Sequence, residues 1–107
     1  MENLLEDMGK RILERRKQLG LTQEELAEKA GVTSQMISTA ELGKKAMRPE
    51  NIIKLCSVLD ISTDYLLLGK ISSEDKSLLS DKISQLSPRQ YRYLEDIINS
   101  FIEAVKL

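Results

Sequence analysis

Residues 22–42 read TQEELAEKAGVTSQMISTAEL, and this stretch decides the fold. Thr22 followed by Glu25 three residues later is the pattern of a capping box, in which each side chain accepts a backbone N–H of the other residue. Good helix formers continue from there to Ala30. Gly31 then breaks the run, because glycine commonly follows the last residue of a helix. The sequence therefore predicts a short helix that ends at Ala30.

A second short helix follows the glycine. Either Thr33 or Ser34 is placed to cap it, and it ends near Leu42, before Gly43. Two short helices joined by a few residues that include glycine are the signature of a helix-turn-helix. In DNA-binding proteins with this motif, the second helix enters the major groove while the first crosses the DNA backbone. The apolar residues suited to locking the two helices together are Leu26, Ala27, Ala30, Val32 and Ile37.

The segments on both sides of the motif also predict helices. Before it, an apolar stripe predicts a helix over roughly residues 4–19, and Gly20 ends that helix. After it, Pro49 suits the first position of a fourth helix. The apolar residues of this fourth helix are Ile52, Ile53, Leu55, Cys56 and Leu59.

A fifth, short helix closes the first part of the chain. Ser62 is placed to cap it, it runs through Leu67, and Gly69 follows. Glycine and proline are scarce in the chain and helix formers dominate, which favours an all-α fold. We therefore expect a five-helix domain over residues 1–69, followed by a C-terminal helical segment over residues 70–107.

The C-terminal segment begins with polar residues. Residues 70–77 are rich in serine and charge, which predicts a linker that becomes a helix. A sixth helix is expected around Leu78, Leu79, Ile83 and Leu86. The run Ser87-Pro88-Arg89-Gln90 then marks the start of a last helix that reaches about Val105.

The last helix carries an apolar stripe at three-four spacing, which is the seam of paired helices. The stripe can pack back on the chain's own domain or form a homodimer interface. We favour the homodimer, because a single helix beyond a closed domain would otherwise leave the stripe in water. The expected dimerisation residues are Tyr91, Leu94, Ile97, Ile98, Phe101, Ile102 and Val105.

Composition excludes several classes of protein. The 107 residues include one cysteine, Cys56, and no histidine, which excludes an intrachain disulfide framework and a zinc site built on Cys and His. Cys56 is expected in the core. With no histidine, no nucleophile motif and no phosphate-cradling glycine loop, the sequence predicts neither an enzyme nor a cofactor. No membrane-spanning run or signal peptide is recognisable, so we expect a cytoplasmic protein without membrane contact.

The charge distribution favours nucleic acid more than the net charge does. The whole chain has a formal net charge of −1, which argues mildly against a nucleic-acid partner. Residues 8–48, however, contain nine basic and five acidic residues, which leaves +4 on the segment that includes the predicted motif. Positive charge is therefore concentrated where phosphate binding would need it.

A long, ordered set of residues matches the pattern of a known family. It comprises Met8-Gly9-Lys10-Arg11-Ile12, residues 19–27, residues 30–33, Ile37-Ser38, Glu41, Gly43-Lys44, Pro49 and residues 62–67. On these residues the chain resembles the helix-turn-helix family of phage Cro and lambda-type repressors, also called the xenobiotic-response-element family. The resemblance covers about residues 8–69 and implies a five-helix, lambda-repressor-like DNA-binding domain.

The resemblance also implies roles for single residues. Gln23 would bond a phosphate, Lys44 would contact the backbone, and Arg16 and Glu41 would form an internal salt bridge. Met36, which is unusual for the family, would contact a thymine methyl group or simply pack. The expected DNA-binding residues are Gln23, Thr33, Ser34, Gln35, Met36, Ser38, Thr39, Lys44 and Lys45, of which Ser34, Gln35, Ser38 and Thr39 would face base edges.

Two positions depart from the family pattern. Ala40 stands where a bulkier apolar residue is usual, so looser local packing is expected. Leu42 stands where a polar residue is usual near the DNA backbone, so no phosphate contact is expected from it.

Taken together, the residues predict a sequence-specific transcriptional regulator, a repressor that binds double-stranded DNA as a homodimer through a recognition helix at about residues 33–42. The alternative is an antitoxin or anti-regulator whose C-terminal helices bind a partner protein, because such proteins can use the same DNA-binding domain.

Overall fold

The chain is all-α over residues 3–106, the part that this computed structural model describes. The elements are α1 (Leu4–Gln18), α2 (Gln23–Ala30), α3 (Ser34–Glu41), α4 (Pro49–Leu59), α5 (Thr63–Leu68), α6 (Ser73–Ile83) and α7 (Pro88–Val105). They form two compact units, residues 1–75 and 76–107, which are described separately below. The predicted fold class is confirmed.

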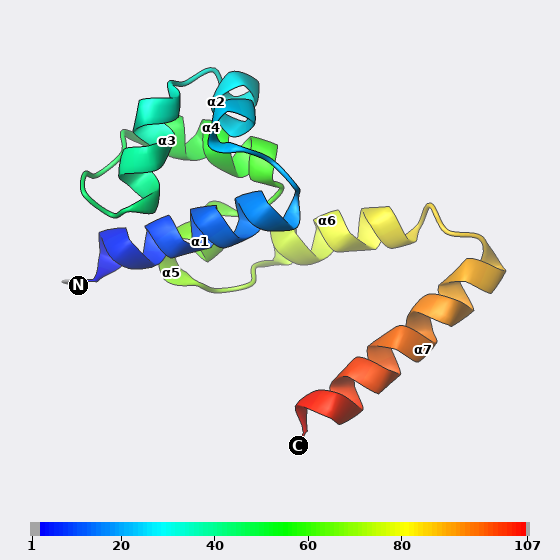
Figure 1. Cartoon of the computed structure of the whole chain (residues 1–107). Helices are drawn as coiled ribbons and strands as arrows, with labels where there is room; N and C mark the ends of the chain where they lie inside the picture. Colours follow the sequence, from blue (N-terminus) through cyan, green and yellow to red (C-terminus); the bar gives the residue numbers. More distant parts are fainter. Residues whose placement is uncertain (1–2, 107) are drawn as a thin grey trace. The chain divides into compact units, whose positions relative to one another are not determined.

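The first unit is a closed bundle of α1–α5, in which α2 and α3 pack across α1 and α4 (Figure 1). Its core is a single cluster of apolar side chains. Six of them are the largest fully buried side chains of the described residues, and they come from all five helices: Ile12, Leu26, Ile37, Leu55, Leu59 and Leu66. The predicted locking residues Leu26, Ala27, Ala30 and Ile37 are buried in this cluster, and Val32 packs against it.

A close helix crossing brings α1 against α3. A Cβ atom built on Gly9 of α1 would lie 2.5 Å from the backbone oxygens of both Ala40 and Glu41. No other residue fits there, because backbone atoms cannot turn aside as a flexible side chain can. Ala40 itself is buried in the core cluster.

Two arginines of α1 hold the ends of other helices. Arg11 donates from Nη1 to the carbonyl of Leu66 in α5 at 3.0 Å, and Arg15 donates from Nε to the carbonyl of Leu59 at the end of α4 at 2.8 Å. Carbonyls at a helix C-terminus lack intrahelical partners and carry partial negative charge, so a guanidinium is a favourable partner there. These two cations therefore stabilise the fold.

Local capping sets most of the helix boundaries. The capping boxes expected at Thr22 with Glu25 and at Ser87 with Gln90 are both present. Of the two candidates for the cap of α3, Thr33 is the one whose side chain accepts a hydrogen bond, from the N–H of Met36 at 3.1 Å. Gly31 ends α2 in the left-handed conformation with φ of 70°.

The sixth helix differs from its expected position. α6 begins at Ser73, inside the stretch expected to be a linker, and ends at Ile83, so Leu86 lies in the turn before α7. The early start has a local reason, since Ser72 accepts a hydrogen bond from the N–H of Asp75 at 3.3 Å in the manner of a helix cap.

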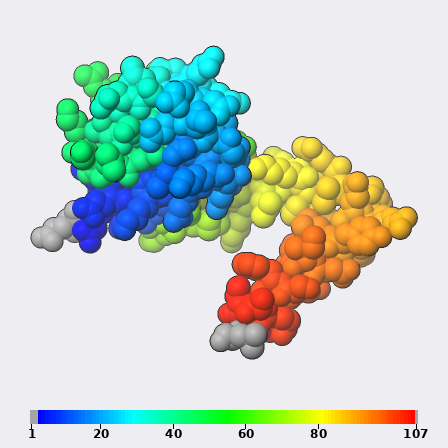
Figure 2. Space-filling view, viewed as in Figure 1, coloured from blue at the N-terminus to red at the C-terminus, as the bar shows by residue number. Residues whose placement is uncertain are grey.

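The second unit is built differently from the first. Figure 2 shows the side chains of α1–α5 packed closely against one another in the first unit. None of the residues of α7 is buried, and its apolar side chains are strongly exposed, for example Ile97 at 65% and Phe101 at 66%. A cavity of about 560 Å³ lies between α6 and α7, lined among others by Leu79, Ile83, Tyr91, Leu94 and Ile98. No helix in residues 3–106 is long and apolar enough to cross a membrane.

Candidate nucleic-acid interface

α3 presents a polar face because its apolar face is anchored in the core. Ile37 and Ala40 are buried, and their neighbours on the opposite side of the helix remain accessible to solvent. Gln35 and Thr39, one helical turn apart, are linked by a hydrogen bond of 3.5 Å from Nε2 to Oγ1. Thr33, Ser34 and Gln35 are exposed, while Ser38 and Thr39 are half-buried. The expected reading residues therefore lie together on one helix and its N-cap.

Met36 has a packing role. Its side chain is half-buried and packs against the core cluster. It also lines the hollow described next, so part of it remains accessible from outside. In this position the Met36 side chain can pack against the core and still be reached by a base from outside.

A hollow of about 340 Å³ lies beside α3, between this helix, the following loop and the start of α4. From α3 and its cap it is lined by Thr33, Gln35, Met36, Thr39 and Ala40, and from the other side by Lys45, Ala46, Met47, Arg48 and Asn51. Two cations thus stand next to the predicted recognition helix. An anionic strand running past α3 would find positive charge along this edge.

Arg48 and Asn51 are candidate residues that the sequence-based list lacks. Arg48 belongs to the basic loop of residues 44–48, and this charge run was a usable signal for it. Asn51 carried no such signal, because only the folded arrangement places the start of α4 at the edge of the hollow. Lys44 is exposed in the same loop but does not line the hollow.

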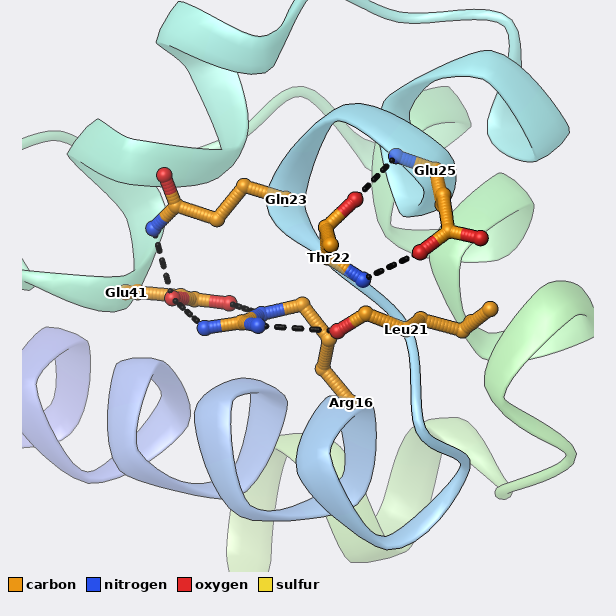
Figure 3. Close-up of polar contacts among 6 residues, drawn as sticks. All are labelled: Arg16, Leu21, Thr22, Gln23, Glu25 and Glu41. Carbon is orange, nitrogen blue, oxygen red and sulfur yellow. Dashed lines mark hydrogen bonds and ion pairs between the residues drawn. The ribbon is translucent and has the colours of Figure 1, made fainter.

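Three helices meet at an ion pair drawn in Figure 3. Arg16 of α1 donates to both oxygens of Glu41 at the end of α3, from Nε to Oε2 at 2.6 Å and from Nη2 to Oε1 at 3.0 Å. Its remaining nitrogen, Nη1, donates to the carbonyl of Leu21 at 2.9 Å. The two side chains are 12% and 5% exposed. This is the pairing that the family resemblance implied.

The positive charge of Arg16 and the negative charge of Glu41 neutralise each other. The hydrogen bond to Glu41 raises the pKa of Arg16, against a lowering effect of burial. A carboxylate as buried as Glu41 would be costly without such a bidentate partner. Because the pair is neutral as a whole, its carboxylate does not place an uncompensated negative charge beside a surface proposed to meet phosphates.

Gln23, the first residue of α2, is tied to the same carboxylate. Its Nε2 donates to Oε1 of Glu41 at 2.9 Å (Figure 3). This bond fixes the orientation of the amide. Nε2 carries a second N–H, which is a further donor. Since the first backbone N–H groups of a helix also lack intrahelical acceptors, Gln23 presents donors at a helix N-terminus.

The remaining candidates fall outside this surface. Cys56 is a core residue, as expected, and burial raises the pKa of its thiol to about 11, with smaller contributions from Glu74 and Asp75. Leu42 is 60% exposed at the end of α3.

No group of three or more acidic, Cys or His side chains among residues 3–106 is placed to hold a metal ion. The expected dimerisation residues all lie on α7, and six of the seven are exposed, with Leu94 half-buried.

Comparison with known proteins places the chain in a family. The helix-turn-helix family model matches residues 12–66, which span α1 to α5. An uncharacterised HTH-type transcriptional regulator of Bacillus subtilis, YqaE, is 30% identical over 95 residues, covering 84% of this chain and 82% of that protein.

Two solved structures are similar. The P22 c2 repressor protein, in complex with a synthetic operator, is 40% identical with a TM-score of 0.57, and the match covers 59% of this chain and 96% of that chain. A chain of the SinR protein/SinI protein complex is 32% identical with a TM-score of 0.57, and the match covers 90% of this chain and 98% of that chain. The chain thus belongs to the helix-turn-helix family of Cro/C1-type transcriptional regulators, which bind DNA and are not enzymes.

Proposed function

We propose that this regulator is a repressor that binds a two-fold operator as a homodimer, with α3 in the major groove. The observation that carries the proposal is the polar face of α3, which stands beside a hollow with two cations and ends at the neutralised pair of Arg16 and Glu41. A similar chain, the P22 c2 repressor protein, was crystallised with a synthetic operator. The repressor role is transferred from that similarity.

On this proposal the residues divide into reading and positioning groups. Ser34, Gln35, Ser38 and Thr39 meet base edges, and an amide such as Gln35 can bond an adenine with two hydrogen bonds. Gln23, Lys44, Lys45 and the N-cap Thr33 meet phosphates, which set affinity and register but carry no sequence information. Met36 contributes an apolar contact to a thymine methyl group. Arg48 and Asn51 belong with the residues that contact phosphates, because they line the hollow together with Lys45.

The proposed dimer forms through the C-terminal segment of residues 70–107, while residues 1–69 read the DNA. The argument is the apolar stripe of α7, in which Tyr91, Ile98 and Ile102 are each 44% exposed and Phe101 is 66% exposed. Soluble proteins rarely leave a contiguous apolar surface of this kind uncovered. A second copy of the same stripe is a chemically matched partner, and two reading units then meet half-sites about one DNA turn apart.

A selection experiment tests the DNA-binding part of the proposal. The full chain is incubated with a random DNA library, and bound duplexes are sequenced and then measured at several salt concentrations. We expect a two-fold motif whose affinity falls steeply with salt. Enrichment of no motif, or affinity that is independent of salt, would overturn it. Expression of a reporter placed behind the selected motif then distinguishes repression from activation.

A second candidate function rests on the same exposed stripe. A chain similar to this one was solved in the SinR protein/SinI protein complex, which supports a partner protein as the occupant of α7. The chain would then be an antitoxin or anti-regulator that binds one protein stoichiometrically through residues 70–107. The mass in solution separates the two: a purified dimer favours the repressor, and a monomer that captures one stoichiometric partner favours the alternative.

A further inference from the structure

A single carboxylate joins the start of α6 to the start of α5. Asp75, in the first turn of α6, accepts four hydrogen bonds. At Oδ1 it accepts from the N–H of Ser62 at 2.8 Å, and at Oδ2 from the hydroxyl of Ser62 at 2.5 Å. Also at Oδ2 it accepts from the N–H and the hydroxyl of Ser72, at 2.9 Å and 3.1 Å. We call Ser62, Ser72 and Asp75 the Asp75 clasp.

The clasp is built on a buried helix cap. Ser62 is 2% exposed, and its Oγ accepts the N–H of Tyr65 at 3.0 Å to cap α5. Its own N–H and O–H therefore need an acceptor inside the protein, because water does not reach them. Asp75 supplies that acceptor for both groups from thirteen residues further along the chain. Neither Asn nor Ala could do the same, since Asn would place an N–H donor where one of the two carboxylate oxygens accepts, and Ala has no acceptor there.

The chemistry of the carboxylate agrees with this geometry. Burial raises the pKa of Asp75, but the hydrogen bonds from Ser62 and Ser72 together lower it by more, so that its pKa lies below the ordinary range. Hydrogen bonds to a charged acceptor are also stronger than those between neutral groups. The first turn of α6 is thus held on the unit that carries α3.

We propose that Asp75 is a positioning residue for DNA recognition: by docking the first turn of α6 on the cap of α5, it makes paired reading units prefer one half-site spacing. This inference rests on the proposed homodimeric operator binding. α6 leads from the first unit into the segment that carries α7, so the Asp75 clasp stands at the point where assembly is coupled to reading. A loose start of α6 would let each reading unit find its half-site independently, at the cost of spacing preference.

The test uses the full chain with Asp75→Asn and, as a matched control, Asp81→Asn on the exposed part of α6. The probes are a duplex selected from a random library by the wild-type chain, the same duplex with its half-site spacing changed by one or two base pairs, and a single half-site. We expect D75N to lower the preference for the selected spacing by about threefold or more while affinity for the single half-site stays unchanged. D81N should behave as wild type.

A readout without DNA keeps the inference separate from the proposed function. Exchange of the Ser62 and Ser72 amide protons, followed by NMR, should be faster in D75N than in wild type or D81N. Unchanged exchange, or unchanged spacing preference in a D75N chain that binds DNA, overturns the inference alone. A wild-type chain that prefers no paired half-sites overturns the proposed function instead. If D75N does not fold, Asp75→Glu and Ser72→Ala weaken the clasp more mildly and are judged by the same two measurements.

Discussion

Both units of this chain are built from amphipathic helices, but the first unit buries its apolar side chains and α7 exposes them. α1–α5 bury their apolar stripes against one another, with Ile12, Leu26 and Leu55 fully buried. α7 is the most clearly amphipathic long helix of the chain, yet it buries none of its residues. An amphipathic pattern therefore predicts that the apolar face of a helix packs against another surface, but it does not say whether that surface is in the same chain.

The difference also separates two tasks. In the first unit, packing and ion pairs hold the polar face of α3 in place, so recognition depends on a rigid scaffold. In the second, the exposed stripe of α7 would make the proposed association with a second copy or a partner depend on concentration and affinity. Changes in the core of the first unit should therefore act on folding, and changes in the stripe of α7 on assembly.

The largest effect is expected at the ion pair of the first unit. Arg16→Met leaves the carboxylate of Glu41, which is 5% exposed, without its bidentate partner. Breaking one side of such a buried pair costs about 3–5 kcal/mol of unfolding free energy. Denaturant unfolding of R16M measures this. Glu41→Gln together with R16M should recover part of the loss, because the buried charge is then gone. A loss below about 1 kcal/mol for R16M alone would show that water reaches the carboxylate.

The comparison of the two units is tested directly by matched truncations. Ile12→Ala removes a fully buried side chain of α1 and should cost about 2–5 kcal/mol of unfolding free energy. Ile98→Ala, on the 44% exposed stripe of α7, should instead lower the mass seen by light scattering at a given concentration while the first unit stays folded. If I98A destabilises the isolated monomer as much as I12A does, α7 is part of a core within one chain.

Within the first unit, reading and phosphate residues should respond differently. Gln35→Ala should lose about 1–3 kcal/mol of discrimination at one base pair of the selected motif, because an exposed amide on α3 is removed. Lys44→Ala should weaken binding to all sequences alike and reduce the salt dependence. Affinities for the motif and its single-base variants, at two salt concentrations, measure both. The reverse pattern would mean that α3 does not carry base recognition.

The smallest expected effect concerns pH and the Asp75 clasp. The folded pKa of Asp75 lies below its unfolded value, so its contribution to stability is present above about pH 4 and is lost as the pH falls through the folded pKa. The difference in unfolding free energy between wild type and D75N should therefore be constant, at about 1–2 kcal/mol, near pH 6–7 and shrink toward pH 3. Denaturant titrations at these pH values measure it. An undiminished difference at pH 3 would contradict the role of the charge.

Most of the fold could be predicted because its signals act over three or four residues. Thr22 with Glu25 and Ser87 with Gln90 each satisfy backbone groups within a single helical turn, so the sequence alone reveals the start of α2 and of α7. The cap at the start of α6 is also local, since Ser72 accepts a hydrogen bond from the N–H of Asp75. What the sequence does not reveal is the contact of α6 with α5, because Asp75 binds Ser62 thirteen residues earlier and no pattern within one helical turn links the two.

The sequence by itself determined the all-helical class, the turn between α2 and α3 and the polar face of α3, because helix propensity, capping and apolar periodicity are local properties of the chain. Only the tertiary structure decided which polar side chains meet. Gln23 is held by Glu41, Asn51 reaches the hollow beside α3, and Asp75 binds Ser62 because separate helices come together in the fold. Hydrogen bonds and ion pairs depend on distances of a few ångströms between such helices, and no local pattern encodes those distances.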